Sequence, residues 1–428
     1  MTTLTVRRSG PLEGGATLPG DKSLSHRALI LGALARGRST ARGWLDGGDT
    51  RATLAAVQAL GVEIERDGES GLSIHGKDLE ATDRPCDCAN AGTAMRLLAG
   101  VLAGQSFDST LDGSEQLRRR PMRRITDPLR RMGAQIEDDD GRAPLRIRGS
   151  RLHGTLHRLE IASAQVKSAL LLAGLHAEGP TTIIEPGPSR DHTERLLTAM
   201  GAELVLDGPT IRLLKSDVEL QPLDLTIPGD FSSAAFPMIA TLIVPRSDVR
   251  LSAVGLNPTR TGLLDVLRRM QGDIVVQEVS EESGEAVGDL RVRASGLRGI
   301  LIEGDDVVRA IDEFPVLAVA ATQAEGTTEV RDAAELRVKE VDRIGLLALE
   351  LRKLGARIEE RPDGFLVEGP ARLEGARVDS HGDHRLGMAL AVAGLVAEGE
   401  TVVENADCIA DSFPGFDRTL AQLGAEIR

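Results

Sequence analysis

The 428-residue sequence contains no tyrosine, one tryptophan and seven phenylalanines. Proteins that bind single-stranded nucleic acids stack the bases on aromatic side chains, and quaternary ammonium ligands are held in aromatic cages. The shortage of aromatic residues argues against both kinds of site. The net charge of −14 also argues against a general nucleic-acid-binding protein, which needs a basic surface. We therefore expect no nucleic-acid partner, and any anionic ligand must be held by local cations that oppose the overall charge.

Cysteine is also scarce, and no apolar run is long enough to cross a membrane. The three cysteines, Cys86, Cys88 and Cys408, cannot form a disulfide framework, which predicts a reducing compartment. The longest apolar stretch, at 387–397, falls well short of the ~20 residues that a membrane-spanning helix needs. The first residues lack the apolar core of a signal peptide. These absences predict a cytoplasmic protein without a membrane partner.

Motifs for metals and nucleotides are missing as well. Cys86 and Cys88 have no second ligand pair nearby, and His381 and His384 have no evident third ligand, so no zinc site is predicted. The G-x-G-x-x-G motif of dinucleotide-binding proteins, the phosphate-binding P-loop and the G-x-S-x-G turn of hydrolases are all absent. The sequence therefore does not indicate a nucleotide-dependent enzyme or a serine hydrolase.

Two repeated elements alternate along the chain. The first is an amphipathic helix that ends at a glycine and is followed by a strand. Glycine is expected at the C′ position of a helix because it adopts the left-handed conformation at little cost. The glycines recur at intervals of 68–83 residues and are Gly61, Gly133, Gly201, Gly272, Gly355 and Gly424.

The second repeated element is a helix of small apolar residues with a polar start. These helices are apolar on nearly every side, which predicts that they are buried. Their first residues are Ser, Asp or Asn, which are types that cap helix N-termini. The six helices are predicted at 21–35, 90–103, 163–175, 230–243, 312–324 and 383–396.

Strands complete each repeat and indicate an α/β fold. Alternating runs such as 72–76 and 145–149 predict strands joined by hairpin turns. Six repeats of about 70 residues exceed the period of ordinary solenoids, so we predict two domains of three repeats each. The boundary is expected near Pro228–Gly229, and the first strand, within residues 4–10, could pair with either domain.

Residues suited to binding anions gather at or near the starts of the buried helices. The free N–H groups and the positive dipole end of a helix start attract anions. Arg and Lys side chains add charge and hydrogen-bond donors. If the three helices of each domain point the same way, their starts form a site for one or two strongly anionic ligands. The cations are Lys22, Arg27, Arg96, Arg120, Arg190, Lys339, Arg343 and Arg385.

Carboxylates lie among these cations. Asp312 and Glu313 open the fifth buried helix, and Glu340 lies between Lys339 and Arg343. An acid at a helix start is either an N-cap or a proton-transfer group held among cations. The sequence leaves both alternatives open for Asp312.

Seven segments, in order along the chain, resemble the 5-enolpyruvylshikimate-3-phosphate (EPSP) synthase family, the 3-phosphoshikimate 1-carboxyvinyltransferases. The resemblance runs from about residue 8 to the C-terminus. The segments are GDKSLSHR at 20–27, NAGTAMR at 90–96, RRRPM at 118–122, SAQVKS at 163–168, IDEFP at 311–315, RVKEVDR at 337–343 and GDHR at 382–385.

The resemblance implies a two-domain inside-out α/β barrel, with six repeats, three per domain, around buried parallel helices. It implies that the chain crosses twice between the domains. Residues 1–20 and 229–428 then form the first domain and residues 21–228 form the second. The active site of such a protein is expected in the interdomain cleft.

The resemblance also implies a reaction. Members of this family transfer the enolpyruvyl group of phosphoenolpyruvate to the 5-hydroxyl of shikimate 3-phosphate and release phosphate, by addition and elimination through a tetrahedral intermediate. They do so in chorismate and aromatic amino-acid biosynthesis, and they are the target of glyphosate. We expect these two small-molecule partners, no cofactor, no metal and a monomeric enzyme.

Two alternatives stay open at this point. One is an enolpyruvyl transferase that acts on UDP-N-acetylglucosamine, although residues 118–122 show no clear counterpart of its nucleophilic cysteine. The other is a catalytically idle anion-binding protein of the same fold. The intact set of acid–base residues argues against that second alternative.

The resemblance assigns roles to individual residues. The implied proton-transfer groups are Asp312, Glu340 and Lys22. The implied shikimate 3-phosphate ligands are Lys22, Ser23, Arg27, Ser163, Ala164, Gln165, Arg190, Asp312 and Lys339. The implied phosphoenolpyruvate ligands are Lys22, Gly92, Arg120, Gln165, Arg343 and Arg385. Residues expected to shape the same pocket are Asn90, Thr93, Arg96 and His384.

Two positions depart from the common family pattern. Asp411 stands where many members have Lys, so one cation on the phosphoenolpyruvate side is missing. Leu97 stands where many members have Pro. Gly92, in contrast, retains the small residue that this family links to glyphosate sensitivity.

Overall fold

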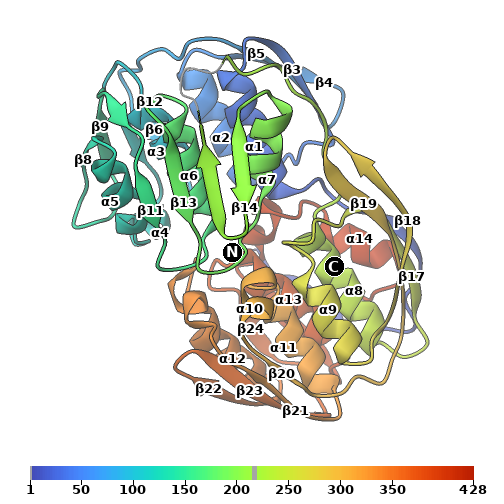
Figure 1. The fold of residues 1–428 in the computed structure, drawn as a ribbon. Coiled ribbons are helices and arrows are strands. Elements are labelled where there is room, and N and C mark those ends of the chain that lie inside the picture. The colour runs from blue at the N-terminus through green and yellow to red at the C-terminus, as the bar shows by residue number, and fades with distance from the viewer. Residues whose placement is uncertain (1, 215–218) are drawn as a thin grey trace. The chain divides into compact units, whose positions relative to one another are not determined.

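The computed structural model describes residues 2–214 and 219–428, and their structure is mixed α/β (Figure 1). Contacts within the chain divide it into two compact units. Unit 1 consists of Met1–Pro19, Pro228–Glu281 and Glu285–Arg428. Unit 2 consists of Gly20–Ile227 and Glu282–Gly284. The first strands of the chain therefore fold with the C-terminal half.

One order of strands and helices recurs in both units. A short strand comes before a buried helix. The strand that follows the helix pairs in parallel with that first strand. A second helix and an antiparallel hairpin follow. In the second repeat the strand order is β6-β7-β9-β8. Its elements are β6 (Cys86–Asp87), α3 (Gly92–Ala103), β7 (Ser109–Asp112), α5 (Arg123–Arg131), β8 (Gln135–Glu137) and β9 (Leu145–Arg148). The pairing aligns Cys86, Leu111 and Leu145, which are all buried, on one face of this sheet.

The other repeats of unit 2 follow the same order. The first has strand order β16-β3-β5-β4, so a strand from the end of the unit completes its first sheet. Its elements are β16 (Asp224–Thr226), α1 (Lys22–Leu34), β3 (Gly37–Arg42), α2 (Gly48–Ala59), β4 (Glu63–Asp67) and β5 (Gly71–Gly76). The third has strand order β11-β13-β15-β14. Its elements are β11 (Leu156–Arg158), α6 (Ala164–Gly174), β13 (Thr181–Ile184), α7 (His192–Ala199), β14 (Leu204–Asp207) and β15 (Thr210–Leu213). The second repeat also contains α4 (Glu115–Arg118), the third also contains β12 (Ala177–Glu178), and β10 (Leu152–His153) lies between these two repeats.

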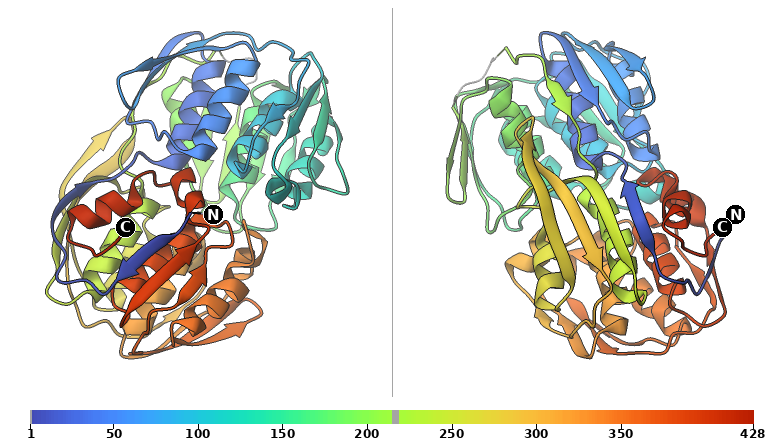
Figure 2. Two further views of the ribbon diagram at one scale, coloured as in Figure 1. Left: turned by 180° about the vertical axis from the view of Figure 1, so that it is seen from behind. Right: turned by 90° about the vertical axis from the view of Figure 1, so that its right-hand side faces the viewer.

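Unit 1 repeats the arrangement with two differences, because strands from the start of the chain take part in its fourth and sixth sheets. Its fourth repeat, with strand order β18-β19-β17-β2, consists of β2 (Glu13–Thr17), α8 (Phe231–Ile243), β17 (Asp248–Gly255), α9 (Gly262–Arg269), β18 (Asp273–Glu282) and β19 (Glu285–Arg293). The fifth, with order β20-β21-β23-β22, consists of β20 (Leu301–Ile302), α10 (Asp305–Arg309), α11 (Phe314–Gln323), β21 (Gly326–Val330), η1 (Ala334–Val338), α12 (Arg343–Lys353), β22 (Arg357–Arg361) and β23 (Gly364–Gly369). The sixth, with order β1-β25-β24, consists of β24 (Arg377–Asp379), α13 (His384–Gly394), β25 (Glu400–Glu404), η2 (Ala406–Asp411), α14 (Phe416–Gln422) and β1 (Leu4–Arg7). In the sixth sheet β1 pairs antiparallel with β25, and Val6 lies opposite Thr401. Figure 2 shows the blue β1 beside the red β25.

Each unit has its own hydrophobic core, built around its buried helices. In unit 2, α3 packs against α1 and α6, and in unit 1 the helices α8, α11 and α13 pack against one another. Every residue of α3 except Thr93 is buried. Small residues let these helices approach closely, since a Cβ atom on Gly100 of α3 would lie 2.2 Å from the Ala169 carbonyl oxygen of α6. The composition that predicts burial thus also sets the helix spacing.

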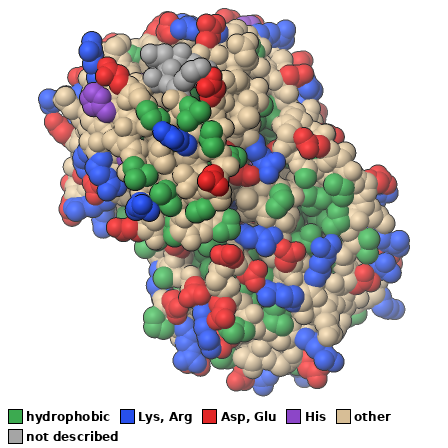
Figure 3. Space-filling view, viewed as in Figure 1, with side chains coloured by type: hydrophobic (Ala, Val, Ile, Leu, Met, Phe, Trp, Pro, Cys, Tyr) green, Lys and Arg blue, Asp and Glu red, His purple; other side chains and the backbone are tan. Residues whose placement is uncertain are grey.

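Charged side chains cover the surface in both signs. On the face shown in Figure 3, acidic and basic side chains are interspersed. Exposed ion pairs such as Arg7–Glu400 at 2.8 Å and Arg291–Asp248 at 2.7 Å are typical of this surface. Such pairs contribute about 0–1 kcal/mol each. Within the described ranges, no helix combines the length and the apolarity that a membrane span requires.

The predicted caps hold for some of the buried helices and fail for two. The side chains of Asp21, Ser163, Asp230 and Asp383 accept hydrogen bonds from backbone N–H groups at the starts of α1, α6, α8 and α13. By contrast, α3 begins after Ala91 and α11 after Glu313, and neither N-cap side chain makes a capping bond. The prediction of the N-cap residue is wrong there, because the N-cap of each helix lies one residue later than expected.

The two residues that were expected as N-caps make other contacts. Asn90, expected at the start of α3, instead accepts a hydrogen bond from the Ser114 hydroxyl through its Oδ1. Asp312 directly precedes Glu313, which is the N-cap residue of α11. The N-cap alternative for Asp312 is therefore wrong, and its carboxylate makes the contacts with arginines described below.

The glycine prediction holds at the ends of five helices and fails at one. Gly201, for example, has φ of +92°, and four of the other five glycines also have left-handed φ values. In the fourth repeat the C-cap of α9 is Met270, so Gln271 and not Gly272 takes the left-handed conformation, at φ +67°. A residue with a Cβ atom is strained there, by about 1–2 kcal/mol.

Replacing Gln271 by Gly should therefore stabilise unit 1. The side chain of Gln271 is exposed, so little packing is lost. We expect Gln271→Gly to raise the free energy of unfolding by about 1 kcal/mol, measured by urea denaturation followed by circular dichroism. The matched reverse variant is Gly201→Gln, whose Cβ would find its nearest neighbour 3.9 Å away and which should lose a similar amount. An unchanged or lower stability of Gln271→Gly would contradict the strain argument.

Candidate functional site

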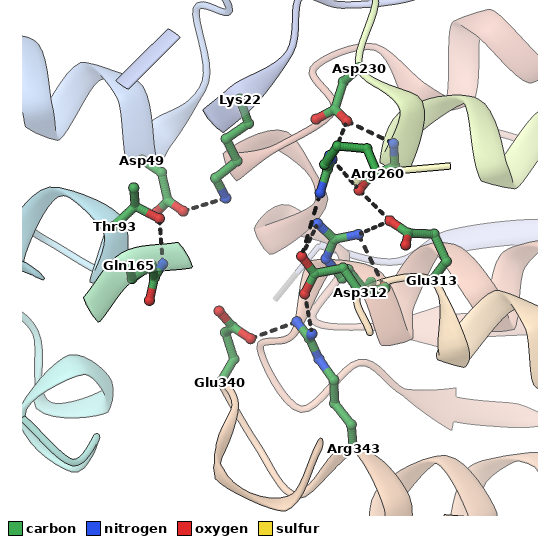
Figure 4. Close-up of polar contacts among 12 residues, drawn as sticks. Lys22, Asp49, Thr93, Gln165, Asp230, Arg260, Asp312, Glu313, Glu340 and Arg343 are labelled. Atoms are coloured by element: carbon green, nitrogen blue, oxygen red, sulfur yellow. Dashed lines mark hydrogen bonds and ion pairs between the residues drawn. The ribbon is translucent and has the colours of Figure 1, made fainter. Parts of the chain in front are cut away.

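Unit 2 holds a lysine at the start of its first buried helix. Lys22 is the first residue of α1, and its ammonium forms an ion pair with Asp49 in the first turn of α2 (Figure 4). Both side chains are mostly buried, 15% and 13% exposed. Near them, burial lowers the pKa of His26 to about 3, and the ring Nδ1 lies 2.6 Å from the Thr53 hydroxyl. His26 is thus neutral at physiological pH and joins α1 to α2 by a hydrogen bond.

Arg27 lies one turn further along α1 and is buried. Its Nε donates to the Thr193 hydroxyl at 2.7 Å, and its Nη2 donates to the Ser168 hydroxyl at 2.9 Å. Its Nη1 donates to the Ser23 carbonyl at 3.1 Å. The guanidinium is therefore fixed against α6 and α7, and the starts of α1 and α6 are held together.

Gln165 connects the starts of α6 and α3. Its Oε1 accepts a hydrogen bond from Arg96, and its Nε2 donates to the Thr93 hydroxyl at 2.8 Å (Figure 4). Both amide atoms of Gln165 are thus oriented by residues of α3. Three residues that the sequence places near the ligands therefore form one hydrogen-bonded group in unit 2.

Gly92 begins α3 directly beside an arginine. A Cβ atom at Gly92 would lie 2.6 Å from Nη1 of Arg120 and 3.2 Å from Nη1 of Arg96. Any larger residue would have to move the Arg120 guanidinium, so glycine is the residue that permits this approach. Leu97, the departure in the same helix, is fully buried and faces the core.

The remaining predicted residues of unit 2 lie on the same elements or on adjoining loops. Ser163 caps α6, and its Oγ accepts from the Val166 amide at 3.5 Å. Ala164 is the first residue of that helix, and Ser23 is the second residue of α1. Arg190 lies in the loop between β13 and α7 and is partly buried.

In unit 1, the carboxylate of Asp312 lies among three arginines (Figure 4). Its oxygens are 3.4 Å from Nη1 of Arg343, 3.7 Å from Nη2 of Arg385 and 3.9 Å from Nη1 of Arg260. Nη1 of Arg385 also donates to the Asp312 carbonyl at 3.1 Å. The side chain of Asp312 is 14% exposed, so these charges act at reduced solvent screening.

Arg343 is the most deeply buried of these cations, at 2% exposed. Its Nε donates to Asp383 at 2.8 Å, and its Nη2 donates to Glu340 at 2.6 Å. Burial alone would lower the pKa of Arg343, but Asp383, Glu340 and Asp312 together raise it. Arg343 therefore stays charged, and it fixes two of the predicted proton-transfer carboxylates relative to each other.

Lys339 differs from the arginines because it titrates near neutrality. Burial lowers its pKa to about 8, and the charges of Asp312 and Glu340 counter that effect only in part. The lysine directly follows η1 and lies four residues before Arg343, the first residue of α12. Its charge should therefore change within the pH range of ordinary enzyme assays.

Several contributors were not identified from the sequence. Asp49, Asp230, Arg260 and Asp383 each hold a residue of the site or the start of a buried helix. Arg260, for instance, donates to Ser232 at 2.8 Å and to Asp230 at 3.2 Å. Each lies on a different helix or loop from the residue with which it forms an ion pair, so the pairing is visible only in the three-dimensional structure. The N-cap pattern is the one signal that marks Asp230 and Asp383.

The two sets of residues have the chemistry of anion-binding sites that also contain acids and bases. Helix starts and cations in each unit can hold phosphate and carboxylate groups. Asp312 and Glu340 can exchange protons beside them. Among the residues that the structure describes, no group of three or more His, Cys, Asp or Glu side chains could hold a metal ion.

Comparisons with known proteins agree with this chemistry. A family model described as EPSP synthase (3-phosphoshikimate 1-carboxyvinyltransferase) matches residues 6–420. A protein named 3-phosphoshikimate 1-carboxyvinyltransferase from Desulforudis audaxviator is 51% identical over 429 residues, covering 99% of this chain and 100% of its own. One of the same name from Citrifermentans bemidjiense is 50% identical over 421 residues, covering 97% of this chain and 98% of its own.

Solved structures extend the similarity to three dimensions. The structure of EPSP synthase from Acinetobacter baumannii superimposes with a TM-score of 0.88 at 41% identity, over 100% of this chain and 99% of that one. The enolpyruvyl transferase NikO from Streptomyces tendae gives a TM-score of 0.82 at 21% identity, over 100% and 98% of the two chains, and this likeness concerns the fold alone. From the match over nearly the whole chain and from the end-to-end relatives, it follows that this chain belongs to the EPSP synthase family and has the mixed α/β fold of the enolpyruvyl transferases.

Proposed function

We propose that this protein is a transferase that moves the enolpyruvyl group of phosphoenolpyruvate to the 5-hydroxyl of shikimate 3-phosphate and releases phosphate. Such a reaction would serve chorismate and aromatic amino-acid biosynthesis. The observation that carries the proposal is the carboxylate of Asp312, held among three arginines directly before the N-cap residue of a buried helix.

The shikimate 3-phosphate ligands are proposed on α1, α6 and the neighbouring loop of unit 2, with two more in unit 1. Lys22 and Arg27 supply charge, and Gln165 supplies an oriented amide. The hydrogen bonds of Gln165 support this role, because its side chain is already ordered before a ligand binds. The proposed set is Lys22, Ser23, Arg27, Ser163, Ala164, Gln165, Arg190, Asp312 and Lys339.

The phosphoenolpyruvate ligands are proposed to come from both units. Gly92 supports this assignment, since the absence of a Cβ atom lets the Arg120 guanidinium lie over the start of α3. An anion there would meet both the arginine and the helix N–H groups. The proposed set is Lys22, Gly92, Arg120, Gln165, Arg343 and Arg385, with Asn90, Thr93, Arg96 and His384 around it.

The proposed chemistry is addition followed by elimination. Asp312 takes the proton of the 5-hydroxyl as that oxygen bonds to C2 of phosphoenolpyruvate, and C3 gains a proton to give a tetrahedral ketal phosphate. Loss of a proton from the new methyl group then breaks the C2–O bond to phosphate. Glu340 and Lys22 are the proposed proton partners of C3 and of the leaving phosphate. The arginines stabilise the charge that develops on the phosphate and carboxylate oxygens.

Finer features of the architecture are part of the same proposal. The parallel and antiparallel pairing repeated in each sheet, with buried helices inside each unit, supports the inside-out arrangement of six repeats. We further infer that the two units are the two domains of the enzyme and that it acts as a monomer in the cytoplasm, with no cofactor. The alternative, a transferase that acts on a UDP-linked amino sugar, is less well supported. The relatives at 50% and 51% identity are named 3-phosphoshikimate 1-carboxyvinyltransferase.

A phosphate-release assay with defined substrate pairs tests the function directly. We expect phosphate from phosphoenolpyruvate and shikimate 3-phosphate together, with equimolar enolpyruvyl product by mass spectrometry, and none from either substrate alone. Replacing shikimate 3-phosphate by UDP-N-acetylglucosamine should give no release. Phosphate release with the nucleotide sugar would favour the alternative transferase. No phosphate release with either substrate pair would favour a catalytically idle anion-binding protein.

Replacing Asp312 by Asn tests the proposed base. The variant keeps shape and most hydrogen bonding but cannot accept the hydroxyl proton. We expect kcat to fall by about 10²-fold or more, while the Kd of shikimate 3-phosphate from calorimetry changes little. Asp306→Asn is the matched control, because Asp306 lies in the same segment but pairs with the surface residue Arg269, and its kcat should stay near normal. Near-normal turnover of Asp312→Asn would remove the residue from catalysis.

The pKa of Lys339 predicts an alkaline limit on substrate capture. Lys339 is charged below its pKa of about 8 and neutral above it. If it binds shikimate 3-phosphate, kcat/KM for that substrate should be level below pH 8 and fall as the pH rises above 8, because this parameter reports groups of the free enzyme. In Lys339→Arg, whose guanidinium does not deprotonate, the decline should vanish or move above pH 9. An unchanged alkaline limb in the variant would assign the titration to another group.

A further inference from the structure

Three charged side chains that the proposed mechanism does not use are buried together in unit 2. They are Lys167 on α6, Glu185 just after β13 and Glu194 on α7, and their side chains are 2%, 6% and 3% exposed. The Lys167 ammonium lies 2.7 Å from Glu185 Oε2 and 2.7 Å from Glu194 Oε1. One cation thus joins two helices and the loop between a strand and a helix.

The same ammonium also fixes the loop that carries Arg190. Nζ of Lys167 donates to the Ser189 carbonyl at 3.3 Å, and the Ser189 hydroxyl donates to Glu185. Ser189 is the residue directly before Arg190. The backbone from which Arg190 extends is therefore held by the buried cluster from two directions.

Two residues adjacent in sequence to members of the cluster bind Arg27. Ser168 follows Lys167, and Thr193 precedes Glu194. The hydroxyls of Ser168 and Thr193 lie 2.7 Å from each other, and each accepts a hydrogen bond from Arg27, at 2.9 Å and 2.7 Å. The spacing between α6 and α7 that Lys167 sets is thus the spacing that the Arg27 guanidinium bridges.

A buried ion cluster is an expensive way to join two helices. Desolvation of such charges can exceed their mutual attraction, and apolar residues of similar volume often give equal or greater stability. Elsewhere α6 is joined to its neighbours by apolar packing, as the buried Leu170, Leu171 and Leu172 show. Stability alone therefore does not account for the cluster, whereas fixed geometry at two neighbouring arginines does.

We propose that Lys167, together with Glu185 and Glu194, is a positioning group that sets the geometry of Arg27 and Arg190 for binding shikimate 3-phosphate. The inference rests on the proposed function, since it assumes that these two arginines are ligands of that substrate. The cluster itself touches no substrate in this account. It acts through the Ser168 and Thr193 hydroxyls on one arginine and through the Ser189 backbone on the other.

The decisive variant removes all three charges at once. Lys167→Met combined with Glu185→Gln and Glu194→Gln leaves no uncompensated buried charge, so the protein should remain folded with a melting temperature near that of wild type. We expect its Kd for shikimate 3-phosphate, measured by isothermal titration calorimetry, to rise at least tenfold. KM for phosphoenolpyruvate and kcat at saturating shikimate 3-phosphate should each stay within about threefold, a split that general destabilisation would not produce.

A second variant breaks only the connection to Arg27. Thr193→Val removes the hydroxyl that accepts from Nε and should raise the same Kd about fivefold. Combined with the neutral triple variant, its effect should be clearly less than multiplicative, because both changes act on Arg27. If the triple variant fails to fold, the Kd of Thr193→Val alone still tests the connection to Arg27, and an unchanged Kd would count against it. Lys353→Met is the control, since it removes a lysine paired with the buried Glu350 in unit 1, and its Kd should match wild type.

The outcomes separate the inference from the proposed function. Wild-type protein that binds shikimate 3-phosphate, with the triple and Thr193→Val variants binding equally well, would overturn the positioning role and leave the function standing. A wild-type protein that shows no binding of shikimate 3-phosphate would overturn the proposed function, and the inference with it.

Discussion

Buried cations at or near the starts of helices are the constraint on which the rest of this structure depends. A buried charge without a partner is prohibitively costly, so each cation needs a carboxylate that is itself held in place. Arg343 has Asp383 and Glu340, Arg260 has Asp230, and Lys22 has Asp49. Except for Glu340, which lies three residues before Arg343, the partner in each pair comes from a different helix or loop. The ion pairs therefore fix the relative positions of the elements as well as the charges.

The composition of the helices follows from this arrangement. Helix starts within one unit can share hydrogen bonds, as those of α3 and α6 do through Gln165, only if the helices approach closely. Close approach needs small residues, and a Cβ atom on Gly100 would collide with the backbone of α6. The Ala- and Gly-rich sequence is thus a requirement of the site as well as of the core. Both units meet it with the same order of strands and helices.

Much of the fold could be predicted from the sequence because its signals are local. Burial of α3 and α13 follows from their apolar composition, and the ends of five outer helices follow from glycine. The errors have local physical causes too. Gln271 takes the left-handed conformation because the C-cap of α9, Met270, lies two residues before Gly272, and α11 begins after Glu313 and not at Asp312.

The site was only half visible in the sequence for a different reason. Lys22, Arg343 and Asp312 stand out because cations and acids recur at helix starts. Asp49 and Arg260 do not, because no sequence pattern identifies a residue whose role is to orient another side chain. Lys167 illustrates the limit most clearly. In the sequence it is a single charge in an apolar helix, and only the structure brings Glu185 and Glu194 to it across α7 and the preceding loop.

The helix starts are common to the anion-binding and catalytic parts of this account, so a bound substrate is its most direct test. A crystal structure of the protein with shikimate 3-phosphate should show the phosphate and ring hydroxyls in hydrogen-bonding contact with residues at the starts of α1 and α6. The 5-hydroxyl should lie within hydrogen-bonding distance of the Asp312 carboxylate. A ligand bound away from these helix starts, or with its 5-hydroxyl remote from Asp312, would contradict the central claim.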